Sequence, residues 1–299
     1  MKASPDRGEG IEKFVCKRTV NLRIIKGSNF SPNLVRNQEV KNNTAMVGSL
    51  GTSIIAFLSG LGNLTLFTGQ VFLRLFRGQI NIRNTLDQMV QLGIESLPIT
   101  LVTATFVGMV FAVQIVHEFL QFGAGKMIGG IMGMALWREL APMLTSVVVA
   151  GRVGAAISAE LGTMTVTEQV EAMEAMSQDP ISYLVIPRFV ACALMLPLLI
   201  GLADVVSFFS GFVIAIGTGR INPVAYLYSA NRMLFIKDIT GGLFKGVVFG
   251  MLIALISTYT GLSTSAGARG VGLSTTKAVV LSLVLIFVVN YFLSLAIFA

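Results

Sequence analysis

Long stretches without charged side chains divide most of the chain into hydrophobic segments. Six stretches carry no charge or only isolated charges: residues 42–73, 96–116, 127–159, 189–219, 246–268 and 278–299. A helix of about 20 apolar residues crosses the hydrocarbon core of a bilayer, and each stretch is at least that long. The pattern therefore predicts an all-α integral membrane protein.

The composition agrees with this prediction and narrows the classes of protein. Hydrophobic residues make up 54% of the chain and charged residues 12%, whereas soluble domains contain about 25% charged residues. One histidine, His117, and two cysteines, Cys16 and Cys192, exclude zinc fingers, histidine-rich metal sites and a disulfide framework. The net charge of +7 does not indicate nucleic-acid binding, because the basic residues form no separate soluble domain. We expect no metal and no cofactor.

The first hydrophobic segment differs from the others because Gly, Ser, Thr and Asn are scattered through it. It could cross the membrane or lie in the interface as an elbow. Lys and Arg collect on the cytoplasmic side, so their count can decide. With residues 1–41 inside, a segment that does not cross gives 16 basic residues inside and 4 outside, whereas one that crosses gives 13 and 7. The counts favour an elbow helix over residues 46–76 and five crossings, with the C-terminus outside.

Residues 1–45 are basic and weakly patterned, which predicts a flexible cytoplasmic tail beside an anionic membrane surface. No apolar run typical of a secretory signal occurs before residue 45. Four acidic residues argue against an organellar transit peptide: Asp6, Glu9, Glu12 and Glu39. Residues 46–299 are expected to form the membrane domain.

Small residues recur at four-residue spacing in three segments and form stripes along one helical face. The stripes comprise Gly125, Gly129 and Gly133; Gly242, Gly246 and Gly250; and Gly151, Gly154, Ala155, Ser158, Ala159 and Gly162. Small side chains allow helix backbones to approach closely inside a membrane. Such stripes serve either packing within the chain or a homodimer interface, and the pattern does not choose between these uses.

Charged residues inside apolar segments are the candidate functional residues, because each is costly in a bilayer. Arg138 and Glu139 are adjacent, about 100° apart on a helix, and need not pair with each other. Pro142 follows within one turn and predicts a kink or a freed carbonyl. Asp204 lies inside one segment and Lys245 opens another. These charges are either structural or line a cavity that handles a charged amphiphile.

Residues 160–188 interrupt the apolar pattern between two segments. Their spacing predicts a short amphipathic helix on the cytoplasmic side, over about residues 163–180, with Thr167 as a cap and Asp179-Pro180 as the end. An apolar stripe and an acidic face are expected, formed by Val166, Val170, Met173 and Met176 and by Glu168, Glu171 and Glu174. The helix either packs on its own bundle or docks a partner, for which methionines are well suited.

The sequence contains no motif for energy coupling or catalysis. There is no Gly-x-x-x-x-Gly-Lys-Ser/Thr phosphate loop, and Gly267–Gly272 joins two apolar segments instead of a strand and a helix. No paired-Asp or metal-ligand constellation favours an enzyme of lipid synthesis. The chain is therefore not expected to be an enzyme, and a separate protein would supply the ATP hydrolysis.

Several co-linear blocks of residues resemble the MlaE-type permeases of ABC lipid transporters, which include the lipid-import permease of the plant chloroplast inner envelope. The resemblance covers roughly residues 60–299. It is carried by residues 106–114, 138–145, 149–156, 159–164, 166–170, 179–188, 244–250 and 270–280, among them Arg-Glu-Leu-Ala-Pro-Met-Leu-Thr from Arg138 and Asp-Pro-Ile-Ser-Tyr from Asp179. Two positions depart from the family pattern: Ser265 begins Ser-Ala-Gly-Ala-Arg where Gly-Gly-Ala is common, and Asn290 stands where Asp is frequent.

The resemblance implies an MlaE-type permease fold with an elbow helix and five transmembrane helices. It further implies a permease homodimer with an ABC ATPase subunit, an MCE-domain lipid-binding protein and phospholipid as substrate. Residues 163–180 would be the coupling helix, so the residues implied to contact the ATPase are Val166, Glu168, Val170, Met173, Met176 and Asp179. Arg138, Glu139 and Lys245 match family positions near the lipid cavity, where basic groups suit a phosphate head group.

Two locations and one other function remain open at this point. The resemblance fits the inner membrane of a bacterial cell, and alternatively the inner envelope membrane of a plastid. The alternative function is an ion-coupled secondary transporter or channel that uses Arg138, Glu139 and Asp204 as an ion relay. An ATPase that copurifies with the chain would separate these functions.

Overall fold

In the computed structural model, the described residues 47–76, 81–265 and 267–298 form helices and turns and contain no strand. The predicted tail over residues 1–45 lies outside these described residues. The chain divides into two compact units, residues 1–70 and 71–299. Of the first unit the structure describes only part of helix α2, Val47–Phe76.

The second unit contains the remaining helices, some of which follow one another without a loop. The α-helices are α3 (Ile82–Ile94), α4 (Leu97–Gln121), α5 (Ile128–Ala135), α6 (Ala141–Val149), α7 (Ala155–Val166), α8 (Gln169–Ala175), α9 (Ile186–Gly217), α10 (Pro223–Met233), α11 (Ile236–Leu262) and α12 (Ala268–Phe298). A 3₁₀ turn, η3 (Gly125–Met127), precedes α5. Two π-helical turns join neighbouring helices end to end, η4 (Leu136–Leu140) and η5 (Ala150–Gly154), and a third, η6 (Ile181–Val185), leads directly into α9.

Five helical segments in the described part of the chain are long and apolar enough to cross a membrane. They are Ile82–Gln121, Gly125–Val166, Ile181–Gly217, Ile236–Leu262 and Ala268–Phe298. The predicted all-α membrane fold with five candidate crossings is therefore confirmed. Helix α2 is not among the five, and its placement as an elbow in the interface stays a prediction.

Helix α3 was not expected from the sequence. It is separated from α4 by a short turn, after which Ser96 and Pro98 open α4. An apolar stripe along α3 is exposed: Ile82, Leu86, Val90 and Ile94. Arg83 and Asp87 lie on the same helix beside this stripe and interrupt the uncharged run along the sequence, which is why the search for long uncharged segments missed the helix.

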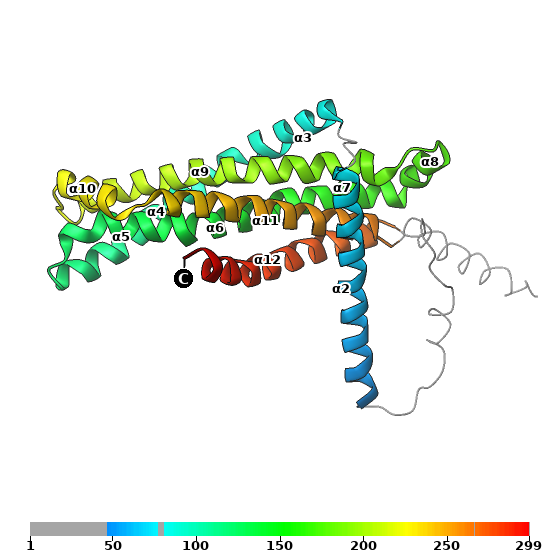
Figure 1. Cartoon of the computed structure of the whole chain (residues 1–299), viewed down its shortest axis with the longest axis horizontal. Helices are drawn as coiled ribbons and strands as arrows, with labels where there is room; N and C mark the ends of the chain where they lie inside the picture. Colours follow the sequence, from blue (N-terminus) through cyan, green and yellow to red (C-terminus); the bar gives the residue numbers. More distant parts are fainter. Residues whose placement is uncertain (1–46, 77–80, 266, 299) are drawn as a thin grey trace, which may run out of the picture. The chain divides into compact units, whose positions relative to one another are not determined.

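Helix α9 lies at the centre of the bundle and packs against α3, α4, α6 and α11, while α12 packs against α7 and α11. Figure 1 shows α9, α11 and α4 running side by side, with α10 near one end of the bundle and α8 near the other. The core is apolar, with fully buried side chains such as Leu136, Ile200 and Phe249. Helices α10 and α8 thus lie at opposite ends of the bundle.

Two of the predicted glycine stripes serve packing within the chain. A Cβ at Gly129 would collide with the backbone of Tyr226, and one at Gly133 with Leu234. In the second stripe, Gly242 faces the Trp137 carbonyl and Gly250 the Cys192 carbonyl. Backbones can approach this closely only where a side chain is absent.

Candidate functional site

Three of the four charged residues predicted from the sequence, Arg138, Glu139 and Lys245, meet where η4, α11 and α12 come together. Arg138 and Glu139 lie in the π-helical turn η4, which leads into α6. In an α-helix the Arg138 carbonyl would accept a hydrogen bond from the N–H of residue 142, four positions along. That residue is Pro142, which has no N–H. The sequence prediction of a freed carbonyl is therefore confirmed.

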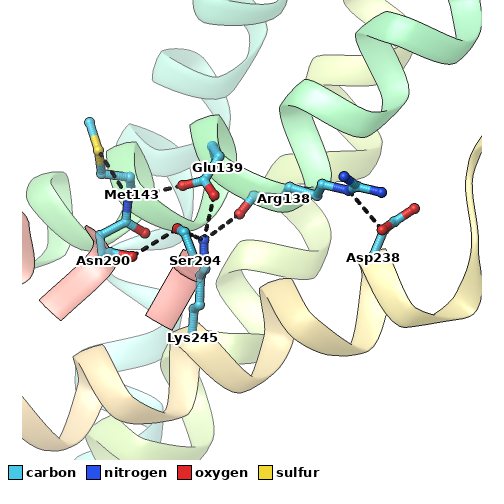
Figure 2. A network of polar contacts seen from close by, with 7 residues as sticks. All are labelled: Arg138, Glu139, Met143, Asp238, Lys245, Asn290 and Ser294. Carbon is cyan, nitrogen blue, oxygen red and sulfur yellow. Dashed lines mark hydrogen bonds and ion pairs between the residues drawn. The ribbon is translucent and has the colours of Figure 1, made fainter. Parts of the chain in front are cut away.

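Lys245 of α11 donates a hydrogen bond to the Arg138 carbonyl, which the missing N–H of Pro142 cannot do. Its buried Nζ donates to the Arg138 carbonyl at 2.8 Å, to Glu139 Oε1 at 2.8 Å and to Ser294 Oγ of α12 at 2.7 Å (Figure 2). An ammonium has three N–H donors, so each one has an acceptor in the protein. Lys245 thereby ties three helical segments together at one point.

Glu139 is also held at both of its carboxylate oxygens. Oε1 accepts from Lys245, and Oε2 accepts from the amide Nδ2 of Asn290 at 2.9 Å. Asn290 thus supplies an N–H donor to Glu139, which an ionised Asp at this position could not do.

Arg138 points away from Glu139 and binds a different carboxylate, Asp238 at the start of α11 (Figure 2). The distance from Arg138 Nε to Asp238 Oδ1 is 2.8 Å. The prediction that Arg138 and Glu139 need not pair with each other is therefore confirmed. Sequence reasoning missed Asp238, which is 100 residues away. The available signal was its place in the first turn of a long apolar helix, where an acidic residue caps free N–H groups.

The members of this cluster differ in how far they reach the surface. The side chains of Arg138 and Glu139 are 34% and 40% exposed, whereas those of Asp238 and Lys245 are 1% and 0% exposed. The ring of Phe298 stacks on the cluster, with its centroid 5.0 Å from the Arg138 guanidinium carbon and 5.1 Å from Lys245 Nζ. The two groups able to meet a ligand from outside are therefore the Arg138 guanidinium and the Glu139 carboxylate, which point in different directions.

The fourth intramembrane charge, Asp204, lies apart from this cluster in the middle of α9. It is completely buried, and neither carboxyl oxygen has a hydrogen-bond partner among the described residues. The three residues of the predicted ion relay are thus not joined by a chain of hydrogen bonds in the described part of the molecule.

The predicted amphipathic helix over residues 163–180 is two helices. Helix α7 runs to Val166, and α8 begins at Gln169 after Glu168, whose backbone is left-handed with a φ of 63°. Thr167 does not cap the second helix, because its hydroxyl donates back to the Thr163 carbonyl. Apolar residues at helical spacing continue across the break, and for that reason the pattern did not reveal it.

The break separates the residues that were expected to form one stripe. Val166 belongs to α7 and Val170 is buried inside the protein, whereas Met173 is half-buried and Met176 is 69% exposed. Asp179 forms an ion pair with Arg74 at 2.8 Å and accepts a hydrogen bond from Ser182. Met176 is thus the residue of this set whose apolar side chain is most available to a partner.

The surface around α8 is acidic. Glu174 is exposed, and Glu171 lies one turn before it. Partial burial, together with the charges of Glu171 and Asp179, raises the pKa of Glu174 above its usual value. An exposed methionine beside several carboxylates suits a partner surface that is partly apolar and partly basic.

Comparisons with known proteins identify the family. The family model described as Permease MlaE matches residues 85–296. A probable ABC transporter permease protein of Synechocystis is 53% identical over 227 residues, which cover 76% of this chain and 86% of that protein. The chloroplastic protein trigalactosyldiacylglycerol 1 of Arabidopsis thaliana is 44% identical over 232 residues, or 78% of this chain and 66% of that protein. A probable permease of the red alga Pyropia yezoensis is 39% identical over 225 residues, or 75% of this chain and 86% of that protein. The chain therefore belongs to the MlaE permease family of ABC transporters.

Proposed function

We propose that the chain is the transmembrane permease subunit of an ABC transporter that moves phospholipid between membranes. Family membership supports the transporter class, and the name of the Arabidopsis relative refers to a glycolipid. The observation that carries the choice of phospholipid is the Arg138 guanidinium. It is partly exposed within an apolar span, and its two terminal nitrogens have no hydrogen bond to the described residues.

A phosphate diester matches this guanidinium in shape and charge. The two terminal nitrogens form a planar fork that donates two parallel hydrogen bonds to phosphate oxygens. The surrounding apolar helices suit the acyl chains of the same molecule. The Glu139 carboxylate is the other exposed charge of the cluster, and its two oxygens retain lone pairs for a hydroxyl or ammonium of a head group. Lys245 was predicted to bind lipid as well, but its buried ammonium is better suited to holding Arg138 and Glu139 in place.

The same proposal assigns ATP hydrolysis to a separate ABC ATPase subunit that docks on α8 and its flanking turns. The support is the exposed Met176 between acidic residues at one end of the bundle. Changing Met176 to Glu is expected to weaken copurification of the ATPase. Met127 is a matched control, because it is an exposed methionine in η3, which packs against α10 at the end of the bundle opposite α8. Full copurification with the Met176→Glu variant contradicts this docking site.

The proposal includes two further partners, which the resemblance to the family implies. We place a second copy of the permease against the first, and an MCE-domain lipid-binding protein at the end opposite α8. Helix α12 supports a dimer or a lipid contact, because large apolar side chains along it are exposed, among them Val284, Phe287 and Tyr291. The proposed location is the inner membrane of a bacterial cell, with the plastid inner envelope as the alternative.

The central test measures bound phospholipid and stability in the same protein. The Arg138→Ala variant is expected to lose most of the phospholipid that copurifies with the wild type, while Arg138→Lys keeps part of it. Arg152→Ala is the control, because Arg152 lies in the same span and pairs with Glu95 at 3.5 Å. Normal lipid content in an Arg138→Ala protein of lower thermal stability would show that Arg138 is structural, and the proposed contact would be withdrawn.

A further inference from the structure

Asp238 and a lipid phosphate would both bind the same guanidinium. Asp238 Oδ1 holds Arg138 Nε at 2.8 Å, so one of the five N–H donors of the guanidinium is in use. A phosphate at the terminal nitrogens would share the positive charge with a carboxylate that is already in place. The strength of the lipid contact therefore depends on how firmly Asp238 holds Arg138.

Asp238 is the fixed member of this ion pair. Its Oδ2 accepts a hydrogen bond from the Phe235 N–H at 2.9 Å, at the beginning of α11, and the side chain is almost completely buried. The partial positive charge at a helix N-terminus stabilises such a carboxylate. Arg138, in contrast, is a long side chain with rotatable bonds and a third of its surface exposed. If one partner moves, it is Arg138.

The charges of the cluster cancel in the structure. Arg138 and Lys245 contribute two positive charges, and Glu139 and Asp238 contribute two negative ones. Without Asp238 the cluster would carry one net positive charge, which matches one phosphate diester. Asp238 thus makes the site electrically neutral when no head group is bound.

We propose that Asp238 is a positioning residue that competes with the lipid phosphate for Arg138 and so promotes release of the head group. This inference rests on the proposed function. When the phosphate leaves, the guanidinium regains its full bond to Asp238, and the free state is stabilised. A transporter needs this balance, because a charge-assisted bidentate contact without a competitor would retain the lipid.

Release of a defined lipid tests the inference. The full-length permease, in detergent micelles, is loaded with a fluorescent phosphatidylglycerol, and transfer to acceptor vesicles of phosphatidylcholine is followed in time. In Asp238→Asn the side-chain oxygen can still cap α11, but the charge that holds Arg138 is gone. We expect release about tenfold slower than in the wild type, since a charge-assisted hydrogen bond that no longer competes corresponds to a change of this order.

Controls separate this effect from changes in stability and in net charge. Asp87→Asn removes the same charge from the exposed surface of α3 and should leave the release rate unchanged. Asp238→Ser keeps a capping oxygen on a shorter side chain and should slow release as Asp238→Asn does. The double variant with Arg138→Ala should bind as little probe as Arg138→Ala alone, because Asp238 acts through Arg138.

The outcomes distinguish the inference from the function on which it rests. If Arg138→Ala loses the probe but both Asp238 variants release it at the wild-type rate or faster, only the role of Asp238 is refuted. If Arg138→Ala retains the probe as well as the wild type does, the proposed head-group contact fails and this inference fails with it. Slower release from both Asp238 variants, with wild-type release from Asp87→Asn, supports the inference.

Discussion

Replacing Lys245 by Met tests whether the buried ammonium holds the helices together. Methionine has a similar length and no N–H, so the change removes all three hydrogen bonds of 2.7–2.8 Å and leaves the Arg138 carbonyl and Glu139 Oε1 without their donor. Removing one partner of a buried ion pair costs about 3–5 kcal/mol. Glu139 is 40% exposed and keeps its hydrogen bond from Asn290, so we expect a loss near the lower limit, about 3 kcal/mol.

Thermal unfolding in detergent at a fixed heating rate measures this loss. For a chain of this size, about 1 kcal/mol shifts the melting temperature by roughly 2–4 °C, so Lys245→Met should melt roughly 6–12 °C below the wild type. Lys237→Met is the control on the same helix, because Lys237 is exposed. The double variant with Glu139→Gln should recover part of the loss, since it no longer leaves a carboxylate unpaired. A melting temperature within about 2 °C of the wild type would refute the structural role of Lys245.

Three further predictions concern packing, an unpaired carboxyl and topology. Gly242→Ala places a methyl group against a backbone carbonyl and should lower the free energy of unfolding by about 1–3 kcal/mol. Gly151→Ala is the control, because the space there is open, and it should melt within about 2 °C of the wild type. Equal melting temperatures for the two variants would contradict the close approach at Gly242. Asp204→Leu should raise the melting temperature, because the carboxyl has no partner among the described residues; a lower melting temperature would contradict this. In the five-crossing topology a cysteine at exposed Tyr228 should be labelled from outside intact cells and one at exposed Ala175 should not; external labelling at Ala175 would refute the topology.

The sequence predicted the parts of the fold that depend on local pattern. Charge-free segments indicate the five spans because the bilayer imposes the same requirement on each of them. The freed carbonyl before Pro142 was predictable for a similar reason, since a missing N–H is a property of one residue. Helix α3 was missed because Arg83 and Asp87 interrupt the uncharged run along the sequence, so the search for uncharged stretches passed over it.

The partners in the charged cluster could not be predicted in this way. Arg138 binds Asp238 and Lys245 binds Glu139, at separations of 100 and 106 residues. Those separations are bridged by the packing of η4 against α11, which no local pattern encodes. The break at Glu168 was missed for another reason, because apolar residues at helical spacing continue on both sides of a left-handed residue. Long-range pairing and single backbone reversals therefore required the structure.

In the proposed function, the two basic residues of the cluster contribute to lipid transport by different routes. Lys245 satisfies the carbonyl that Pro142 leaves free, and so fixes the turn from which Arg138 and Glu139 diverge. Arg138 uses that fixed turn to direct its fork outward. Loss of either side chain would therefore reduce lipid transport, and a transport assay alone would assign both to the lipid site. Stability and lipid content together separate them, because the Lys245→Met variant should unfold at a lower temperature, whereas Arg138→Lys, which can still pair with Asp238, should lose part of the lipid and melt near the wild type.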